Sequence, residues 1–475
     1  MNIFKEIFLK SKSSKKKILL DKNYTYSDLY NLTDEYLSFF KLNLKSREII
    51  SVISDYSIDF IAIILSARIN GNILCILNPN STDFEKKNIL YQSNYSMVIT
   101  DRKIIKTSKK FKNIFYKKRK KNKKLNKDDA FIVFTSGTTS YPKGAILTNK
   151  SIENNVKGII HQLKFISRDR TIIYTPPNYA MGISQIITFT YLKCSFVFDN
   201  NGIKFANDFL DKIRKYKITI LNLNLASFKY LRFYKNKYIS PFLKIVMCGG
   251  MKMHPDDAKE IFNFFDNKYL VNFYGCTENS PRISHFKITK KQLKRFRDLK
   301  LLPVGQLLKG TKIFIKKLKK NDKKDFGEIY LKGNSLMRCY LNSKNFQKKI
   351  VSYNTKDIGF FSSNYLFVIG RSDNIFKSGN EKISPEEVED KIRPYIKNRT
   401  FIIIKKKHQI LNWQPVLVIE GKEIKSDKTL LDNLNKKISN FKVPKDILYL
   451  NKLDRNSYGK IDRKKIFENV SNYEN

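Results

Sequence analysis

Residues Ala130 to Gly144 read A-F-I-V-F-T-S-G-T-T-S-Y-P-K-G. Phe131 to Thr135 are apolar or β-branched and predict a buried strand. Hydroxyl side chains and one glycine follow, then a lysine, and from Asn149 apolar residues recur at helical spacing. A strand, a small-residue loop with a cation and then a helix can donate backbone N–H groups and hydroxyls to phosphate oxygens. We therefore predict a phosphate cradle made by Thr135, Ser136, Gly137, Thr138, Thr139 and Lys143.

The spacing of this loop differs from the G-x-x-x-x-G-K-[ST] pattern of the P-loop NTPases, because Lys143 lies six residues after Gly137 and is followed by Gly144. A Ser/Thr-rich surface loop is the plainer interpretation. The loop resembles the pattern T-S-G-T-T-G-x-P-K-G of the AMP-forming adenylating superfamily, which contains acyl-CoA synthetases, luciferases and peptide-synthetase adenylation domains. Ser140 replaces one Gly of that pattern.

Composition describes a globular chain with an unusual charge. The 475 residues are long enough for two or more domains, and 41% hydrophobic and 13% aromatic residues exclude a disordered protein. The formal charge of +49 would suit a nucleic-acid or acidic-membrane partner. However, Lys, Ile, Asn, Phe and Tyr, which have A/T-rich codons, are abundant, while Gly, Pro and Trp are scarce. Genome base bias therefore explains the charge without a partner, and we expect no nucleic-acid binding.

Cysteine usage and hydropathy bear on location. The chain has 5 Cys and no C-x-x-C pair, so we expect reduced thiols and a cytoplasmic protein. No signal peptide is evident, because Lys5 and Glu6 interrupt the first apolar stretch. Thr171 to Leu192 carries no charge, but its two prolines and polar groups favour a buried strand, loop and helix over a transmembrane segment.

The first part of the chain alternates strands and helices. The pattern predicts a helix from Leu29 to Phe39 with Ser27 as its N-cap, strands at Ile49–Ile53 and Ile73–Leu77, and a helix at Ile58–Ala67. This alternation favours parallel βαβ units.

Two further motifs fit a nucleotide site. A strand at Lys244–Met247 ends in Gly249 and Gly250, and the resemblance places this turn beneath the adenine, where glycine lets a flat ring approach the backbone. Tyr274-Gly275-Cys276-Thr277-Glu278 is similar to the family's Y-G-x-T-E. The resemblance implies that Tyr274 offers its ring to the adenine, Thr277 its hydroxyl to phosphate, and Glu278 an oxygen ligand to Mg²⁺.

The ribose and the hinge are expected further along. Gly327–Gly333 resembles a strand of a small β subdomain, and Asp357 occupies the position of a family Asp whose carboxylate accepts from the ribose hydroxyls, although Lys356 replaces a Gly. Gly370-Arg371-Ser372-Asp373 is similar to G-R-x-D. The resemblance implies that Arg371 reaches the ribose and that Asp373 is the hinge between two domains. A turn with a surface ion pair is the alternative.

The C-terminal part would complete the reaction. Gly379 and Asn380 lie where the resemblance places the thiol-acceptor path, with Asn380 in place of a second Gly. Ser384-Pro385-Glu386-Glu387 predicts a helix start with a capping box. Lys460, flanked by Gly459 and Ile461-Asp462-Arg463, aligns with the family's catalytic lysine, and an ordinary surface lysine is the competing interpretation.

The acid-binding segment is expected at Tyr174–Gly182, where Tyr179 takes the place of a family His that gates the acyl pocket and Gly182 follows it. Core packing is the alternative. Amino-acid-activating relatives usually place an Asp here to pair with the substrate ammonium, and Thr171–Leu192 has no acidic residue. We therefore expect an acid without an α-amine.

A basic segment lies just before the phosphate loop. Arg102–Lys127 holds fourteen Lys or Arg and no acid. A solvated linker is the default interpretation, and a docking patch for an acidic acyl carrier protein is the alternative.

Together these patterns predict an α/β protein. Residues 1–369 would form a large N-terminal AMP-binding domain of stacked βαβ sheets with a small β subdomain, and residues 370–475 a small mobile α+β lid that carries Lys460. The resemblance implies an ATP- and Mg²⁺-dependent acid–thiol ligase of the acyl-CoA synthetase type, which adenylates an acyl or aryl acid, as in fatty acid metabolism, and transfers the acyl group to CoA. The alternatives are loading of a carrier-protein phosphopantetheine, or a catalytically degenerate basic binding protein.

Overall fold

The structure is a computed structural model. It describes residues 2–100, 114–116, 125–135, 142–235, 237–317, 326–341, 349–379, 381–396, 399–424, 427, 429–435, 442–455 and 461–472.

The first sheet has six strands in the order β4-β3-β1-β2-β5-β6. Its core is parallel, because β1 pairs with β2 and β3 in parallel, while the outer strands β4 and β6 pair antiparallel. The strands are β1 (Ile49–Ile53), β2 (Ile73–Leu77), β3 (Met97–Thr100), β4 (Ile114–Tyr116), β5 (Asp129–Thr135) and β6 (Lys143–Thr148). The helices of this part are α1 (Ile3–Ser11), α2 (Tyr26–Asn43), α3 (Ile58–Asn70) and α4 (Asp83–Ser93). The predicted strands and helices are confirmed here.

The predicted cap of α2 was wrong by two residues. Thr25 is the N-cap: its hydroxyl accepts from the backbone N–H of Asp28, and the Asp28 carboxylate accepts from the backbone N–H of Thr25. Ser27 already lies in the first turn, and its hydroxyl donates to the carbonyl of Lys12 instead.

The second sheet has seven strands in the order β13-β12-β11-β10-β9-β7-β8. Its strands are β7 (Arg170–Ile173), β8 (Ser195–Phe198), β9 (Ile220–Asn224), β10 (Ile245–Gly249), β11 (Tyr269–Gly275), β12 (Arg282–Ile288) and β13 (Gln306–Leu307). The helices are α5 (Asn149–Leu163), α6 (Ala180–Tyr191), α7 (Ala206–Lys215), α8 (Leu225–Tyr234), α9 (Pro255–Phe265) and α10 (Lys290–Leu293), with the short turns η1 (Gly202–Lys204), η2 (Thr277–Asn279) and η3 (Lys294–Phe296). The uncharged segment 171–192 is thus the predicted strand, loop and helix. No helix among the described residues is both long and apolar enough to cross a membrane.

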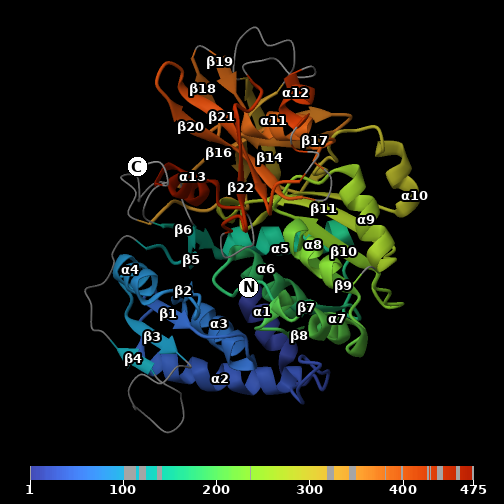
Figure 1. Ribbon diagram of the computed structural model, residues 1–475. Helices are drawn as coiled ribbons and strands as arrows, with labels where there is room; N and C mark the ends of the chain where they lie inside the picture. Colours follow the sequence, from blue (N-terminus) through green and yellow to red (C-terminus); the bar gives the residue numbers. More distant parts are fainter. Residues whose placement is uncertain are drawn as a thin grey trace.

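One hydrophobic core joins the two sheets. It contains Phe131 and Leu147 of the first sheet, Val156 of α5, Ile183 of α6 and Met247 of the second sheet. Helices α5 and α6 lie between the sheets, as Figure 1 shows. The buried face of each helix therefore fixes the position of both sheets.

The predicted order of strand, loop and helix at the phosphate loop was wrong in one respect. A strand, β6, separates the loop from α5, and it pairs antiparallel with β5. Helix α5 begins only at Asn149, capped by the Thr148 hydroxyl, which accepts from the Ser151 backbone N–H. Its N-terminus lies at the far end of a six-residue strand, roughly 20 Å along the chain, so the helix dipole does not serve this loop.

The remaining chain forms three smaller sheets, β14-β15-β16-β17, β18-β19 and β20-β21-β22, which Figure 1 places together at one end of the molecule. The four-stranded sheet is the predicted small β subdomain. The strands are β14 (Thr311–Lys317), β15 (Gly327–Gly333), β16 (Tyr353–Ser362), β17 (Tyr365–Arg371), β18 (Phe376–Ser378), β19 (Glu381–Ile383), β20 (Phe401–His408), β21 (Asn412–Glu420) and β22 (Asp446–Leu450). The helices are α11 (Pro385–Ile392), α12 (Leu430–Asn435) and α13 (Arg463–Asn472).

Helix α11 starts with Pro385 as predicted, but the capping box is absent. The Ser384 hydroxyl lies 3.4 Å from Glu386 Oε2, to which it donates. The Glu387 carboxylate is held instead by Lys442, 2.7 Å away, and by Lys391. Both side chains of the expected box are therefore engaged elsewhere.

Candidate active site

The phosphate loop is anchored by a strand pair. Thr135 ends β5 and Lys143 begins β6, and the two are cross-strand partners. The Thr135 hydroxyl lies 3.3 Å from the Lys143 carbonyl and donates to it. The two ends of the loop are thus side by side, while Ser136, Gly137, Thr138 and Thr139 lie outside the described residues.

Glu278 lies in η2, directly after β11, and its side chain is buried. The Tyr340 hydroxyl donates to Glu278 Oε1 at 2.5 Å and lies 3.2 Å from the Tyr353 hydroxyl. Burial, together with the Glu278 charge, raises the pKa of Tyr340, so this phenol keeps its proton and remains a donor. Lys143 approaches the same tyrosine, with Nζ 6.0 Å from the ring centroid. Tyr340 thereby connects the loop lysine with the predicted metal ligand.

The oxygen atoms of Glu278 and Thr277 fit a magnesium ion that takes most of its ligands from a nucleotide. Among the described residues, no three His, Cys, Asp or Glu side chains gather as a metal site. Glu278 would contribute one carboxylate, with Thr277 half-buried beside it. Magnesium typically takes one or two carboxylates and completes its shell with phosphate oxygens and water.

Three residues predicted to bind the nucleotide are in contact: Tyr274 and Arg371 both hydrogen-bond to Asp357. The Tyr274 hydroxyl donates to Asp357 Oδ2, and Arg371 Nη1 lies 3.1 Å from Oδ1. Arg371 also donates two hydrogen bonds to the Asp373 carboxylate, from Nε to Oδ1 at 2.8 Å and from Nη2 to Oδ2 at 2.7 Å. Burial alone would lower the pKa of Arg371, but the carboxylates of Asp373 and Asp357 outweigh it and raise the pKa. The guanidinium therefore stays charged between two acids.

The glycine turn after β10 is also tightly constrained. A Cβ on Gly249 would lie 2.3 Å from the Phe273 ring, and Gly250 has a φ of +83°. Larger residues would clash at the first position and strain the backbone at the second. Gly249 is therefore required by its packing against Phe273, the neighbour of Tyr274, and the approach of an adenine ring to this turn stays a prediction.

The expected acid-binding segment packs against the core. Tyr179 is the N-cap residue of α6 and is buried. A Cβ on Gly182 would lie 2.4 Å from the Tyr56 hydroxyl, which donates to the Thr175 carbonyl at 2.6 Å. The Gly182 position is therefore set by packing. A cavity of about 20 Å³ lies between helices α5 and α6 and the second sheet.

The hinge and acceptor residues are only partly described. Asp373 lies in the turn between β17 and β18, and Gly379 follows β18 with a φ of +56°, its N–H donating to the Leu411 carbonyl. Asn380 and the predicted catalytic Lys460 lie outside the described residues. The roles of these residues, like the division at residue 370, stay predictions.

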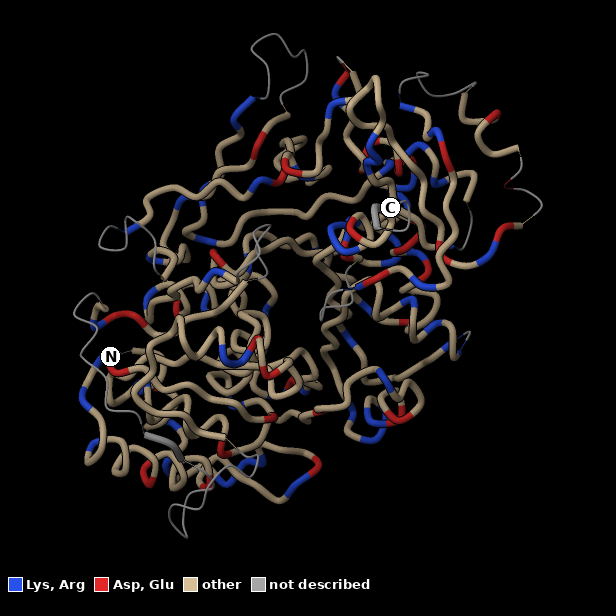
Figure 2. The backbone as a smooth tube through the Cα atoms, turned by 60° about the vertical axis from the view of Figure 1, so that its left-hand side comes forward, with Lys and Arg blue, Asp and Glu red and all other residues tan. Residues whose placement is uncertain are grey.

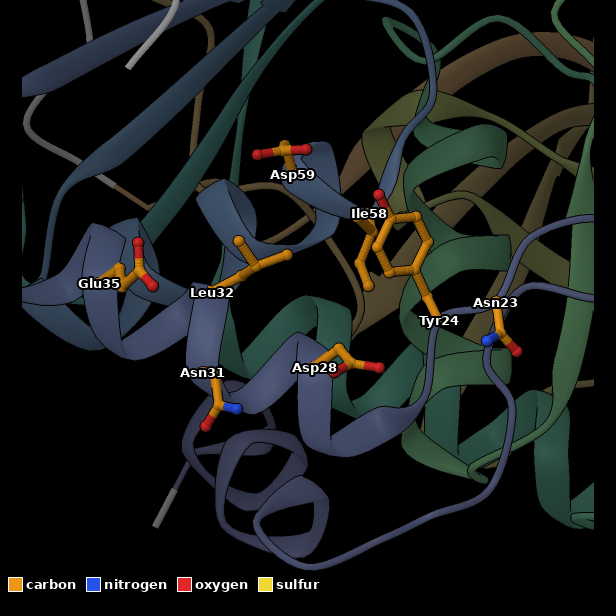
Figure 3. A pocket seen from close by; sticks show the side chains of 8 residues that line it. All are labelled: Asn23, Tyr24, Asp28, Asn31, Leu32, Glu35, Ile58 and Asp59. Atoms are coloured by element: carbon orange, nitrogen blue, oxygen red, sulfur yellow. The ribbon is translucent and has the colours of Figure 1, made fainter. Parts of the chain in front are cut away.

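A larger hollow lies elsewhere on the molecule. Figure 3 shows its lining side chains, which come from α2, the start of α3 and the loop before α2. Its volume is about 340 Å³. Two of its three carboxylates have structural partners, since Asp28 caps α2 and Asp59 accepts from the Tyr36 hydroxyl at 3.1 Å. None of the predicted nucleotide residues lines it.

Two residues of interest escaped the sequence analysis. Tyr340 carries no motif and reaches Glu278 because residues 338–341 pair with β6, with an isolated bridge between Ala145 and Tyr340. Arg282 is a buried arginine beside the cavity. The available signal was a charged residue only four positions after Glu278, the last residue of the Y-G-x-T-E motif.

The chain is similar to known proteins in sequence and in fold. The family model described as AMP-binding enzyme matches residues 10–341. A 2-succinylbenzoate–CoA ligase of Lactococcus lactis subsp. lactis is 27% identical over 342 residues, covering 71% of this chain and 70% of that protein. A D-alanine–D-alanyl carrier protein ligase of Bacillus cytotoxicus is 23% identical over 367 residues, covering 73% and 72%. The solved o-succinylbenzoate coenzyme A synthetase of Bacillus subtilis, in complex with ATP and a magnesium ion, superposes with a TM-score of 0.79 at 18% identity over 98% of this chain and 99% of that one. The chain shares that protein's fold.

Proposed function

Because the chain belongs to the family of AMP-binding enzymes, we propose that it is an ATP-dependent acid–thiol ligase that forms acyl-AMP and then an acyl-CoA thioester. The observation that carries the proposal is the meeting of Tyr274, Asp357 and Arg371, which lie on three strands of two sheets. Each was predicted to bind the nucleoside from a separate motif. Their convergence supports a nucleotide site at the end of β11.

The first half-reaction joins two anions, so its barrier is largely electrostatic. Lys143 and the hydroxyls of the preceding loop would hold the β- and γ-phosphates. Mg²⁺ on Glu278 would neutralise charge on the pyrophosphate leaving group. The Tyr340 hydroxyl bond orients that carboxylate. Lys460 would contact the attacking carboxylate and the α-phosphoryl oxygens, and such a group typically contributes about 10²–10³ in rate.

The second half-reaction requires Lys460 to leave the site so that a thiol can enter. We assign residues 370–475 as a lid that turns about Asp373. The described turn at Ser372–Asn374, between β17 and β18, offers a short segment for that rotation. Gly379 and Asn380 would line the path of the pantetheine arm.

The acid is proposed to lack an α-amine. The segment from Thr171 to Leu192 has no carboxylate for an ammonium, and the nearby buried Arg282 would repel one. This distinguishes the chain from the relative named for D-alanine.

A carrier protein is the second candidate acceptor. It is favoured by the similarity to a D-alanyl carrier protein ligase and by the basic segment Arg102–Lys127, most of which lies outside the described residues. Among the residues that the structure describes, Figure 2 shows Lys and Arg spread over many segments rather than gathered on one part, which argues against a dedicated nucleic-acid surface there. The five cysteines are free thiols, consistent with a cytoplasmic location.

The test is a hydroxylamine-trapping screen over short, medium, long-chain and aryl acids, followed by thioester assays with CoA and with holo carrier protein. We expect acid-dependent pyrophosphate release and a thioester with CoA. A thioester only with carrier protein would select the second candidate. Salt-sensitive binding to DNA or anionic vesicles without pyrophosphate release from any acid would overturn the enzyme assignment.

A further inference from the structure

Arg282, the first residue of β12, is a buried cation without a carboxylate. The side chain is 3% exposed, and its guanidinium carbon lies 3.4 Å from the centroid of the Phe273 ring. Nη2 lies 3.3 Å from the Met181 sulfur, a weak acceptor. Nε and Nη1 are buried and have no hydrogen-bond partner within the described residues. None of the three guanidinium nitrogens thus has a strong hydrogen-bond acceptor among the described residues.

Another arginine that is equally buried, Arg338, has a carboxylate partner. Arg338 is also 3% exposed, but Asp129 accepts from its Nε at 2.7 Å and from its Nη2 at 2.9 Å. Burial of a charge is costly unless it is paired and hydrogen-bonded. Burial alone lowers the pKa of Arg282 to about 9, and no acidic side chain offsets it. The site therefore favours an anion from outside the described chain.

Arg282 lines the cavity behind the acid-binding segment. The cavity lies between α5, α6 and strands β9 and β10, and its polar lining comprises Ser184, Gln185, Thr188, Asn222 and Arg282. The Thr188 hydroxyl is buried without a partner among the described residues. Met181, which contacts Arg282, lies between Tyr179 and Gly182 of the segment predicted to bind the acid. The Arg282 guanidinium and these polar side chains thus line the same cavity.

We propose that Arg282 binds a second anionic group at the far end of the acid substrate, so that the preferred acid is a dicarboxylate. The inference rests on the proposed ligase function and names its substrate class. The carboxylate to be activated faces the nucleotide, and the distal carboxylate takes hydrogen bonds from Nε and Nη1. The cavity of about 20 Å³ has room for about one water, so Met181, a flexible side chain, must turn aside when the distal group enters.

The experiment compares acids that differ only by a terminal carboxylate: butanoate with succinate, hexanoate with adipate, octanoate with suberate, and benzoate with phthalate and isophthalate. Acid-dependent pyrophosphate release gives kcat/KM for each. We expect at least one diacid to exceed its partner about 10-fold or more, the effect of a hydrogen-bonded charge. In the Arg282→Met variant the ratio of kcat/KM for that diacid to kcat/KM for its monoacid partner should fall to about 1 or below.

Lys287→Met is the matched control, because it removes a half-buried cation from the same strand, where Lys287 lies over the Tyr269 ring instead of the cavity. Its diacid preference should equal that of the unaltered protein. Thermal melting checks that both variants fold, and the comparison of acids on the unaltered protein stands even where Arg282→Met does not fold.

The outcomes separate the two proposals. Preference for monoacids throughout, or a diacid preference that survives in Arg282→Met, overturns this inference and leaves the ligase intact. Pyrophosphate release from none of these acids nor from the wider acid screen overturns the ligase assignment and this inference with it.

Discussion

Arg371 and Asp357 face each other across β16 and β17, with Arg371 Nη1 3.1 Å from Asp357 Oδ1. The second oxygen of Asp357 accepts from Tyr274. Both oxygens of the carboxylate expected to receive the ribose hydroxyls are therefore engaged by protein donors. A ribose must share or displace these bonds, and the pre-set carboxylate orientation lowers the entropy cost of binding it.

The first prediction concerns Asp357→Asn, which keeps the shape and removes the charge. We expect ATP affinity to fall about 10- to 100-fold, because hydrogen bonds to charged groups contribute about 1.5–3 kcal/mol. Isothermal calorimetry with ATP measures this without knowledge of the acid. Tyr274→Phe is the control, since it removes one donor but leaves the carboxylate, and its loss should be smaller. Unchanged ATP affinity in Asp357→Asn would remove this residue from the site.

The second prediction concerns Glu278. Glu278→Gln should lower kcat of pyrophosphate release about 10²–10³-fold and raise the Mg²⁺ concentration for half-maximal activity, because the amide is a poor metal ligand. Tyr340→Phe removes only the hydroxyl that donates to Glu278, so it should cost less than about 10-fold. Magnesium titrations of the three proteins give the comparison, and an identical magnesium dependence in Glu278→Gln would contradict the assignment.

The third prediction separates the half-reactions. Lys460→Ala should abolish acid-dependent pyrophosphate release, because no cation meets the attacking carboxylate, yet it should still convert supplied acyl-AMP and CoA into thioester. The readouts are pyrophosphate release and thioester formation from synthetic acyl-AMP. Lys465→Ala is a suitable control, since that lysine pairs with Asp454 on the surface. Equal loss of both half-reactions would exclude a lysine that leaves the site.

Much of the fold followed from local pattern. The strands at 49–53 and 73–77 are continuous apolar runs bounded by turns, and their physical cause, burial on both faces of a parallel sheet, is written in the residues themselves. The residues predicted to bind the nucleotide were likewise found as motifs, and Tyr274, Asp357 and Arg371 do come together.

The failures came from tertiary pairing and from competition between side chains. β6 was missed because nothing local distinguishes Lys143–Thr148 from a loop leading into a helix; its partner strand decides it. Tyr340 lies 62 residues from Glu278 and reaches it only through packing on β6. The expected capping box at Ser384 is absent because the Glu387 carboxylate pairs with Lys442 and Lys391 instead.

The fourth prediction tests the hinge. Asp373→Pro fixes φ in the turn after β17, so the lid should stop in one arrangement. We expect thioester formation from supplied acyl-AMP to fall at least about tenfold, with adenylation retained. Asp373→Asn removes the ion pair with Arg371 without restricting the backbone, and it should keep both activities within about tenfold. A proline variant with the same ratio of the two activities as the unaltered protein would exclude rotation at this residue.

The fifth prediction concerns acid stability. His285 is buried, and burial, aided by the Arg282 charge, holds its pKa well below the usual value of 6.5. The unfolded chain binds a proton below about pH 6.5 and the folded chain does not, so this group contributes stability above that pH and loses it as the pH falls toward the folded pKa. The slope is at most about 1.4 kcal/mol per pH unit. Urea unfolding at pH 7.0, 6.0 and 5.5 should therefore show a shallower decline in His285→Gln than in the unaltered protein. His161→Gln, which removes an exposed imidazole on α5, controls for the loss of a histidine. The same decline in His285→Gln as in the unaltered protein and in His161→Gln would show that His285 is not held neutral.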